Sequence, residues 1–200
     1  MPIQNIREPL NEYTINDLNA DTWADFETFF SRYDGVQAGC WCLYYHKTGN
    51  TNGKTQEERA EKNRMGKKEL VEKGKARSVL IYSEGNLIGS CQYGTSDELP
   101  RIGNGRIYRE VAPDHGNATL WRITCFFVDK EYRRRGVTKI LLEETLKKIR
   151  EEGGGIVEAY PVTTPSSIYV WFGFLQTFEE AGFRKVASMG RSRMLMRISL

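Results

Sequence analysis

Three consecutive arginines and a glycine stand at the start of a helical pattern, in the run Arg133-Arg134-Arg135-Gly136-Val137-Thr138. The first backbone N–H groups of a helix are unpaired and carry partial positive charge, so a helix N-terminus binds phosphate groups. Gly136 lets the backbone approach a ligand, Thr138 can add a hydroxyl donor, and the arginines can form charge-assisted hydrogen bonds with a polyphosphate. A solvated basic turn is the other interpretation. The spacing matches neither the dinucleotide fingerprint nor the P-loop.

This turn lies inside a predicted strand–helix–strand unit. The apolar run over residues 123–128 indicates a strand covered on both faces, and it ends at Asp129. Residues 137–150 place apolar side chains on one helical face and charged ones on the other, until three glycines at 153–155 stop the helix. Residues 156–162 predict a returning strand. The unit has the length of a parallel crossover, which puts the basic turn at the C-terminal end of a strand.

The rest of the chain shows weaker patterns. Aromatic residues recur at helical spacing over 21–33, and Thr55-Gln56-Glu57-Glu58 has the spacing of a capping box that opens a charged, peripheral helix towards Lys75. The Cys-rich residues 39–46 predict a buried strand or a tight connection. A hairpin turn joins the first two of three further predicted strands, at 77–83, 89–94 and 106–111. We find neither a repeat nor a linker, and expect a single domain over residues 1–200.

The composition is that of a folded protein. The chain has 200 residues, 40% of them hydrophobic, and 29 Lys and Arg against 26 Asp and Glu leave a net charge of +3. This near balance does not favour nucleic acid as a partner. No apolar stretch approaches the roughly 18 residues of a membrane span, and the first residues lack a signal pattern. We therefore expect no membrane partner and a cytoplasmic location.

The four cysteines, Cys40, Cys42, Cys91 and Cys125, are too few and too scattered for a disulfide scaffold. The Cys40-Trp41-Cys42 spacing is shorter than that of a zinc knuckle, and no second pair accompanies it, although His46 follows four residues later. Buried reduced thiols are therefore favoured over a metal site. We expect no metal.

The run Ile-Thr-Cys-Phe-Phe-Val-Asp-Lys-Glu-Tyr-Arg-Arg-Arg-Gly-Val-Thr-Lys-Ile-Leu-Leu, residues 123–142, resembles the central motif of the GCN5-related N-acetyltransferases. That motif is a strand followed by [Q/R]-x-x-G-x-[G/A] at a helix start. Arg133 and Gly136 occupy its key places, whereas Thr138 departs from the usual Gly or Ala. The order of the later elements also resembles the family, over about residues 77–200. The Thr-Cys-Phe-Phe-Val strand is similar to that of a less characterised branch.

The resemblance implies the acyl-CoA N-acyltransferase fold, an α/β (α+β) arrangement whose central sheet is mixed, mostly antiparallel, splayed and flanked by helices. It implies acetyl-CoA as the acyl donor, with its thioester between strands 123–128 and 156–162. Residues 77–200 would form the coenzyme-binding core and 1–76 a helical region on the acceptor side. Homodimers are frequent in the family. The residues implied to bind the coenzyme are Phe126, Phe127 and Val128 through their backbone, and Arg133, Arg134, Arg135, Gly136, Val137 and Thr138 at the diphosphate.

Forming an amide from a thioester needs a neutral amine, donors for the developing oxyanion and a proton for the leaving thiolate. Glu158 is the leading candidate for the base, because it is an ionisable residue in an otherwise apolar strand beside the expected gap. A solvent-facing or ion-paired carboxylate is the alternative for this position. Glu110 and Asp129 are weaker candidates. The resemblance implies that a backbone N–H near Val128 could stabilise the oxyanion.

The family often places a tyrosine, as the acid that protonates the thiolate, four residues before a Gly-Phe pair. Phe178 occupies that position here and cannot donate a proton. The nearest tyrosines, Tyr160 and Tyr169, are the remaining candidates, and a packed aromatic role suits each equally well. Cys125 could instead be acylated before transfer, but its apolar strand favours an inert thiol. Trp171 belongs to an aromatic stripe that suits either an acceptor pocket or core packing.

These features predict an N-acetyltransferase that moves an acetyl group from acetyl-CoA to a primary amine of a small molecule or peptide, by direct attack in a ternary complex. A non-catalytic acyl-CoA-binding sensor or interaction module is the alternative, and Phe178 favours it. A nucleic-acid-binding domain built on the three arginines is disfavoured, because no aromatic-interleaved basic motif accompanies them. The sequence does not select the acceptor.

Overall fold

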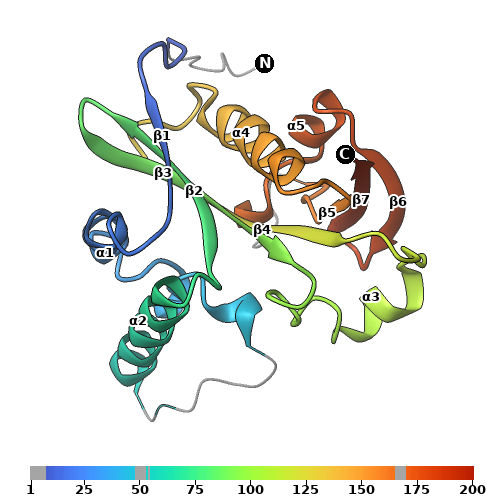
Figure 1. Ribbon diagram of the computed structural model, residues 1–200, viewed down its shortest axis with the longest axis horizontal. Helices are drawn as coiled ribbons and strands as arrows, with labels where there is room; N and C mark the ends of the chain where they lie inside the picture. The colour runs from blue at the N-terminus through green and yellow to red at the C-terminus, as the bar shows by residue number, and fades with distance from the viewer. Residues whose placement is uncertain (1–7, 48–52, 54, 165–169) are drawn as a thin grey trace.

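Within the residues described by the computed structural model, 8–47, 53, 55–164 and 170–200, seven strands form one sheet (Figure 1). Their order is β1-β2-β3-β4-β5-β7-β6. β4 and β5 run parallel, and the other neighbouring pairs are antiparallel. This mixed, mostly antiparallel sheet confirms the predicted fold class. The strands are Thr14–Asp17 (β1), Arg77–Ser83 (β2), Asn86–Thr95 (β3), Leu120–Val128 (β4), Ile156–Ala159 (β5), Arg184–Met189 (β6) and Arg193–Ser199 (β7).

Helices cover both faces of the sheet (Figure 1). Successive side chains of a strand point to opposite faces, and in β4 Phe126 packs with the core under α4, whereas Phe127 packs against α1. The helices are α1 (Trp23–Ser31), α2 (Gln56–Glu72), α3 (Arg106–Val111), α4 (Val137–Glu151) and α5 (Leu175–Glu180). Short 3₁₀ turns lie at Gln37–Gly39, Tyr44–His46 and Val170–Phe172.

The apolar face of α4 fixes the basic turn in place. Val137, Leu141, Leu142, Leu146 and Ile149 are buried in one cluster with the central strands. Burying each such side chain stabilises the fold by about 1.5–3 kcal/mol. The start of α4 is therefore held firmly beside the end of β4, as the predicted strand–helix–strand unit requires.

Residues 106–111, which the sequence predicted to be a strand, form helix α3 instead. Their β-branched residues suggested a strand, but the charges have helical spacing. The Nε of Arg106 and the Oε1 of Glu110 lie 3.8 Å apart, one helical turn from each other. Tyr108 is the buried residue of this helix and turns its ring into the core.

Two other segments differ from their predictions. Of the two predictions for residues 39–46, the tight connection is correct and the strand is wrong, since Cys42 has a φ of +50°. The predicted strand 156–162 ends at Ala159, because Pro161 has no N–H to donate to a sheet. The short strand β1 was not predicted at all.

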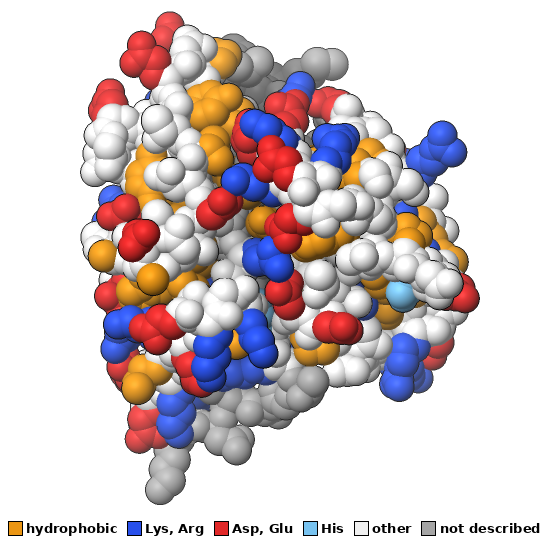
Figure 2. All heavy atoms as spheres, viewed as in Figure 1, with side chains coloured by type: hydrophobic (Ala, Val, Ile, Leu, Met, Phe, Trp, Pro, Cys, Tyr) orange, Lys and Arg blue, Asp and Glu red, His pale blue; other side chains and the backbone are white. Residues whose placement is uncertain are grey.

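The hydroxyl of Thr55 accepts a hydrogen bond from the Glu58 N–H at 3.2 Å, so the predicted cap of α2 is confirmed. This helix is less peripheral than predicted, because Lys67 on its inner face is completely buried. On the molecular face in Figure 2, acidic and basic side chains are interspersed. None of the described helices combines the length and the apolar character that crossing a bilayer requires. The single domain, with its division into 1–76 and 77–200, stays a prediction.

Candidate active site

β4 and β5 separate halfway along β4. Their parallel pairing covers residues 120–123 of β4 and 156–159 of β5, whereas β4 continues to Val128. At the same point the register between β3 and β4 shifts and leaves Thr124 as an extra residue. Such a bulge bends a strand. Among the described strands, residues 124–128 are therefore paired only on the β3 side, and their other edge is open.

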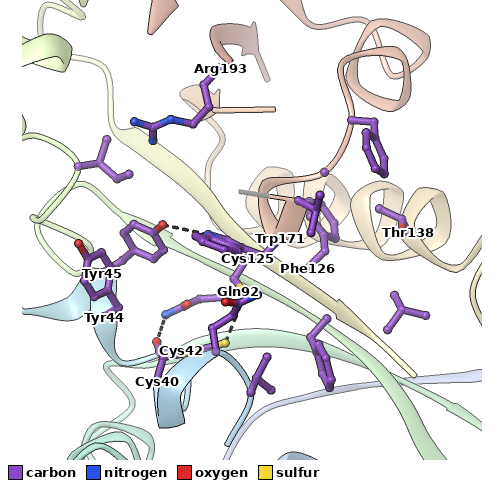
Figure 3. Close-up of a pocket in the computed structure, with 18 of the residues that line it drawn as sticks. Cys40, Cys42, Tyr44, Tyr45, Gln92, Cys125, Phe126, Thr138, Trp171 and Arg193 are labelled. Carbon is purple, nitrogen blue, oxygen red and sulfur yellow. Dashed lines mark hydrogen bonds between the residues drawn. The ribbon is translucent and has the colours of Figure 1, made fainter. Parts of the chain in front are cut away.

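A cavity of about 1410 Å³ lies where the two strands separate (Figure 3). Its wall is built from β4, the start of α4, the turns at 36–45, the loop and helix at 101–108, and residues 170–177. In Figure 3, Thr138 and Arg193 lie on opposite sides of the view, with Cys125 and Trp171 between them. The part around Thr138 is named the α4 end, and the part around Arg193 the β7 end.

The α4 end of the cavity suits an anion. Gly136 is the N-cap of α4 with a φ of +82°, and a Cβ placed on it would meet no atom within 4 Å. The first turn of α4 has no side-chain cap, so the N–H groups of Val137 and Thr138 are open to a ligand, whereas that of Lys139 donates to the Gly136 carbonyl at 2.9 Å. Arg133, Arg134 and Lys139 line the cavity here. The Nε of Arg133 donates to the Val128 carbonyl at 3.1 Å, which holds its guanidinium at the end of β4.

The structure brings together every residue predicted to bind the coenzyme except Arg135. The Nε of Arg135 donates to the Glu8 carbonyl at 3.0 Å, and its guanidinium lies 5.5 Å from the centre of the Tyr132 ring. Arg135 thus anchors the N-terminal segment. The predicted residues that line the cavity are Phe126, Phe127, Val128, Arg133, Arg134, Gly136, Val137 and Thr138.

Glu158 is completely buried and is not among the residues that line the cavity. Its Oε1 accepts hydrogen bonds from Nε and Nη2 of Arg197 at 3.0 and 2.7 Å. Its Oε2 accepts from the hydroxyls of Tyr108 and Tyr160 at 2.8 and 2.7 Å, and the Nε of Arg122 lies 3.8 Å away. Glu158 is therefore an ion-paired carboxylate, which was the alternative to a catalytic base at this position. Of these partners only Tyr108 also lines the cavity.

Of the two predicted acids, Tyr160 is not among the described residues that line the cavity. Tyr160 is completely buried, and burial together with the charge of Glu158 raises the pKa of its hydroxyl well above the usual value. Phe178 is also completely buried and packs against Phe126, with ring centres 6.0 Å apart. Tyr169 lies outside the described residues. The tyrosines that line the described wall are therefore not the ones that the sequence analysis proposed as the acid.

The weaker candidates of the sequence analysis are held by local contacts. Asp129 is buried, and its Oδ1 accepts from the Glu131 N–H at 2.9 Å. The Glu110 side chain is 59% exposed. His115, a loop residue that the sequence did not favour for catalysis, is half-buried, with its Nδ1 3.0 Å from the Ala118 carbonyl oxygen. Within the described residues, no Asp, Glu or His lines the cavity.

Three thiols line the middle of the cavity, those of Cys40, Cys42 and Cys125. The sulfur atoms of Cys42 and Cys125 lie 3.5 Å apart, and both side chains are buried. The pKa of Cys42 is raised well above the usual value by its contact with Cys125 and by burial. All four cysteines are free thiols. In the described part of the chain, no group of three His, Cys, Asp or Glu is placed to hold a metal ion.

Tyr45 and Trp171 meet in the middle of the cavity, and sequence reasoning missed the role of this pair (Figure 3). The Nε1 of Trp171 donates to the Tyr45 hydroxyl at 3.1 Å. Because the hydroxyl accepts this bond, its own hydrogen can be donated into the cavity. Burial raises the pKa of Tyr45 well above its usual value, and the Trp171 bond opposes this effect. The only feature of the sequence that could have pointed to Tyr45 is the pair Tyr44-Tyr45 within the Cys-rich residues 39–46.

A buried polar network supports this part of the wall. The Nε2 of Gln92 donates to the Cys42 carbonyl at 2.8 Å and to Nε2 of His46 at 2.7 Å, while its Oε1 has no hydrogen-bond partner among the described residues. His46 Nδ1 donates to the Glu98 carbonyl at 2.9 Å, and Lys67 Nζ lies 3.2 Å from His46 Nε2. Burial, reinforced by the Lys67 charge, lowers the pKa of His46 to about 2, and burial lowers that of Lys67 to about 8.

The fold and the site together define an acyl-CoA-dependent acetyltransferase. The sequence matches the Acetyltransferase (GNAT) family over residues 2–174, so the chain belongs to that family, whose acyl donor is acetyl-CoA. The open edge of β4 and the uncapped start of α4 fit an extended pantetheine arm and a diphosphate. Membership in the branch with a Thr-Cys-Phe-Phe-Val strand stays a prediction.

Solved structures of the same fold share little sequence with this chain. An acetyltransferase of the family from Desulfovibrio desulfuricans has a TM-score of 0.55 at 13% identity, over 94% of this chain and 99% of that one. The ribosomal-protein-S5-alanine acetyltransferase from Vibrio fischeri has a TM-score of 0.53 at 13% identity, over 95% and 94% of the two chains. The PaiA N-acetyltransferase of Thermoplasma acidophilum, solved with coenzyme A, has a TM-score of 0.53 at 13% identity, over 95% and 100%. No curated protein matches the sequence.

Proposed function

We propose that the protein transfers the acetyl group of acetyl-CoA to the primary amine of a small molecule, by direct attack in a ternary complex. One observation carries this proposal: the open edge of β4 and the uncapped start of α4 face one cavity, which extends past Cys125 to the β7 end. The cavity therefore has room for a donor and an acceptor together. Holding two reactants in line can lower a barrier by about 7–11 kcal/mol.

Tyr45 is the proposed proton donor to the leaving thiolate. It lies at the cavity wall, and its hydroxyl hydrogen can point inward because Trp171 already donates to the oxygen. The Trp171 bond also stabilises the phenolate that forms when the proton leaves. Tyr45 would thus perform the task of the tyrosine that Phe178 replaces. The C–N bond forms as the C–S bond breaks, and the thiolate takes the Tyr45 proton.

The proposed exit for the acceptor's proton is Tyr108. Tyr108 lines the cavity, and its hydroxyl donates to Oε2 of Glu158 at 2.8 Å. Tyr108 can therefore take a proton from the amine, directly or through water, while it passes its own proton to Glu158. In this form Glu158 remains the proposed final base, acting through Tyr108. The Gln92 Oε1, buried without a partner among the described residues, is the proposed acceptor for an N–H of the amine.

The test follows release of the coenzyme A thiol with acetyl-CoA and a panel of primary amines, with products identified by mass spectrometry. A transferase releases thiol in an amine-dependent way and yields an amide. The second candidate is a non-catalytic acyl-CoA sensor, which the completely buried Phe178 in the usual acid position favours. A sensor binds acetyl-CoA, but no amine accelerates thiol release.

A further inference from the structure

The charged side chains in the described wall of the cavity all carry positive charge. Among the described residues, neither Asp nor Glu lines it. The stretches outside the description, 1–7, 48–52, 54 and 165–169, contain no Asp or Glu in their sequence, so they cannot add a carboxylate. The cationic residues are Arg133, Arg134 and Lys139 at the α4 end, and Arg101, Arg106 and Arg193 at the β7 end.

The proposed function accounts for the cations at the α4 end, which face the diphosphate, but it does not use those at the β7 end. Arg193 is the best positioned of them. It begins β7, pairs with Met189 across the β6–β7 hairpin and forms a bridge to Val162. Its guanidinium lies 5.3 Å from the centre of the Phe172 ring. Figure 3 shows it on the same side of the view as Tyr45, across from Thr138.

This arrangement selects acceptors by charge. A second ammonium group at the β7 end would face like charges, and the low polarity of a partly enclosed site strengthens their repulsion. A carboxylate or phosphate there would form a charge-assisted pair with a guanidinium. The charge of Arg193 also acts on the Tyr45 hydroxyl, where it opposes the rise in pKa caused by burial. The field of this arginine thus reaches the middle of the cavity.

We propose that the acceptor is a small primary amine that carries a carboxylate or phosphate group, with its anion at Arg193 and its amine beside Gln92. This inference rests on the proposed function and names its substrate class. The Gln92 Oε1 would accept a hydrogen bond from the amine of the acceptor. The guanidinium of Arg193, held at the start of β7, would pair with the anionic group at the acceptor's other end. The wall at this end suits an acceptor with an apolar body, since Ile102 and Met189 also line it.

The first experiment compares matched amines that differ in one group: 4-aminobutyrate with 1,4-diaminobutane, phosphoethanolamine with ethanolamine, and phenylalanine with phenethylamine. We expect kcat/KM to be higher by at least about tenfold for the anionic member of one or more pairs. The pair with the largest ratio distinguishes carboxylate from phosphate. An equal kcat/KM within every pair, or a preference for the diamine or for the amines that lack an anionic group, overturns the inference and leaves the transferase function standing. If no amine is acetylated, the proposed function fails and the inference with it.

The second experiment tests Arg193 directly. Arg193→Gln should raise KM for the preferred anionic acceptor by at least about tenfold, with unchanged KM for acetyl-CoA and an unchanged circular dichroism spectrum. Arg193→Lys keeps the charge and should retain part of the affinity. Arg191→Gln is the matched control, because Arg191 is exposed next to the same hairpin and does not line the cavity. A folded Arg193→Gln variant with the parental KM overturns the assignment.

Discussion

Glu158 and Arg197 are joined by two hydrogen bonds to one carboxylate oxygen, at 3.0 and 2.7 Å, across the neighbouring strands β5 and β7. The carboxylate is completely buried, and only 13% of the Arg197 side chain is exposed. A buried pair of this kind is sensitive to the loss of one partner, because the remaining charge stays in the interior uncompensated.

Glu158→Gln should therefore lower the free energy of unfolding by about 3–5 kcal/mol, the cost of breaking a buried ion pair. Urea unfolding of parent and variant measures this difference. Glu110→Gln is the control: its ion pair is exposed, so its loss should cost no more than about 1 kcal/mol. A Glu158→Gln variant with parental stability and no turnover would instead indicate that Glu158 acts directly on the substrate.

Tyr108→Phe separates the proposed proton relay from the stability of the ion pair. The change removes one hydroxyl from Oε2 of Glu158 and breaks the path from the cavity. We expect kcat to fall by about 10²-fold or more, the usual contribution of acid–base catalysis. Tyr160→Phe is a matched control, since it removes the other hydroxyl on the same oxygen behind the wall. Equal losses in both variants would exclude a relay through Tyr108.

Tyr45→Phe should lower kcat by about 10²–10⁴-fold, because the thiolate loses its proton donor. Acetyl-CoA affinity, measured by calorimetry, should stay at the parental level. Tyr44→Phe is the comparison variant, because it removes the hydroxyl of the neighbouring tyrosine. Tyr44 is 51% exposed. Parental turnover of the Tyr45→Phe enzyme would assign thiolate protonation to water.

Gly136→Asp should weaken acetyl-CoA binding by at least about tenfold, roughly 1.4 kcal/mol. The variant puts a negative charge where the diphosphate meets the start of α4. Gly116→Asp is matched in backbone strain, since Gly116 also has a positive φ and open space around it, but it lies outside the cavity. Calorimetry should show parental affinity for the Gly116→Asp variant. An unchanged affinity in folded Gly136→Asp would place the diphosphate elsewhere.

The buried neutral His46 predicts a loss of stability in mild acid. In the unfolded chain His46 titrates near pH 6.5, whereas its pKa in the folded protein is about 2. Between these values the unfolded state binds more protons, so stability falls as the pH falls below about 6.5, by up to roughly 1.4 kcal/mol per pH unit. His46→Gln should flatten this part of the curve between pH 7 and 5.5, measured by urea unfolding. Parallel curves for parent and variant would contradict the assignment.

The residues that gather at the α4 end of the cavity could be predicted from the sequence, because their signals are local. The apolar strand, the glycine turn and the amphipathic helix follow one another over residues 123–150, and each shows a regular pattern. Arg135 is the exception, since its outward contact depends on the distant N-terminal segment. The sequence could place Glu158 in a strand, but not its partners at positions 108, 122 and 197, which come from three separate elements.

The middle and the β7 end of the cavity, where the acceptor is proposed to bind, could not be predicted, because their residues come together only through contacts between distant segments. Tyr45 and Gln92 belong to segments whose local patterns indicate only burial, and their proposed roles arise from contacts with distant parts of the chain, such as the bond between Tyr45 and Trp171. The helix at 106–111 was misread because β-branched residues outweighed the helical spacing of its charges. Tyr108 was not predicted as a site residue, because its contact with Glu158 joins positions 50 residues apart.

The hydrogen bond between Trp171 and Tyr45 joins residues 126 positions apart. The coenzyme half, in contrast, is built within one strand–helix unit. The two halves of the cavity therefore differ in contact order, and long-range contacts form late in folding because their loop-closure entropy must be overcome first. A folding intermediate could thus possess the coenzyme cradle before the acceptor wall exists. Acetyl-CoA present during folding would then act as a template on which the remaining wall assembles.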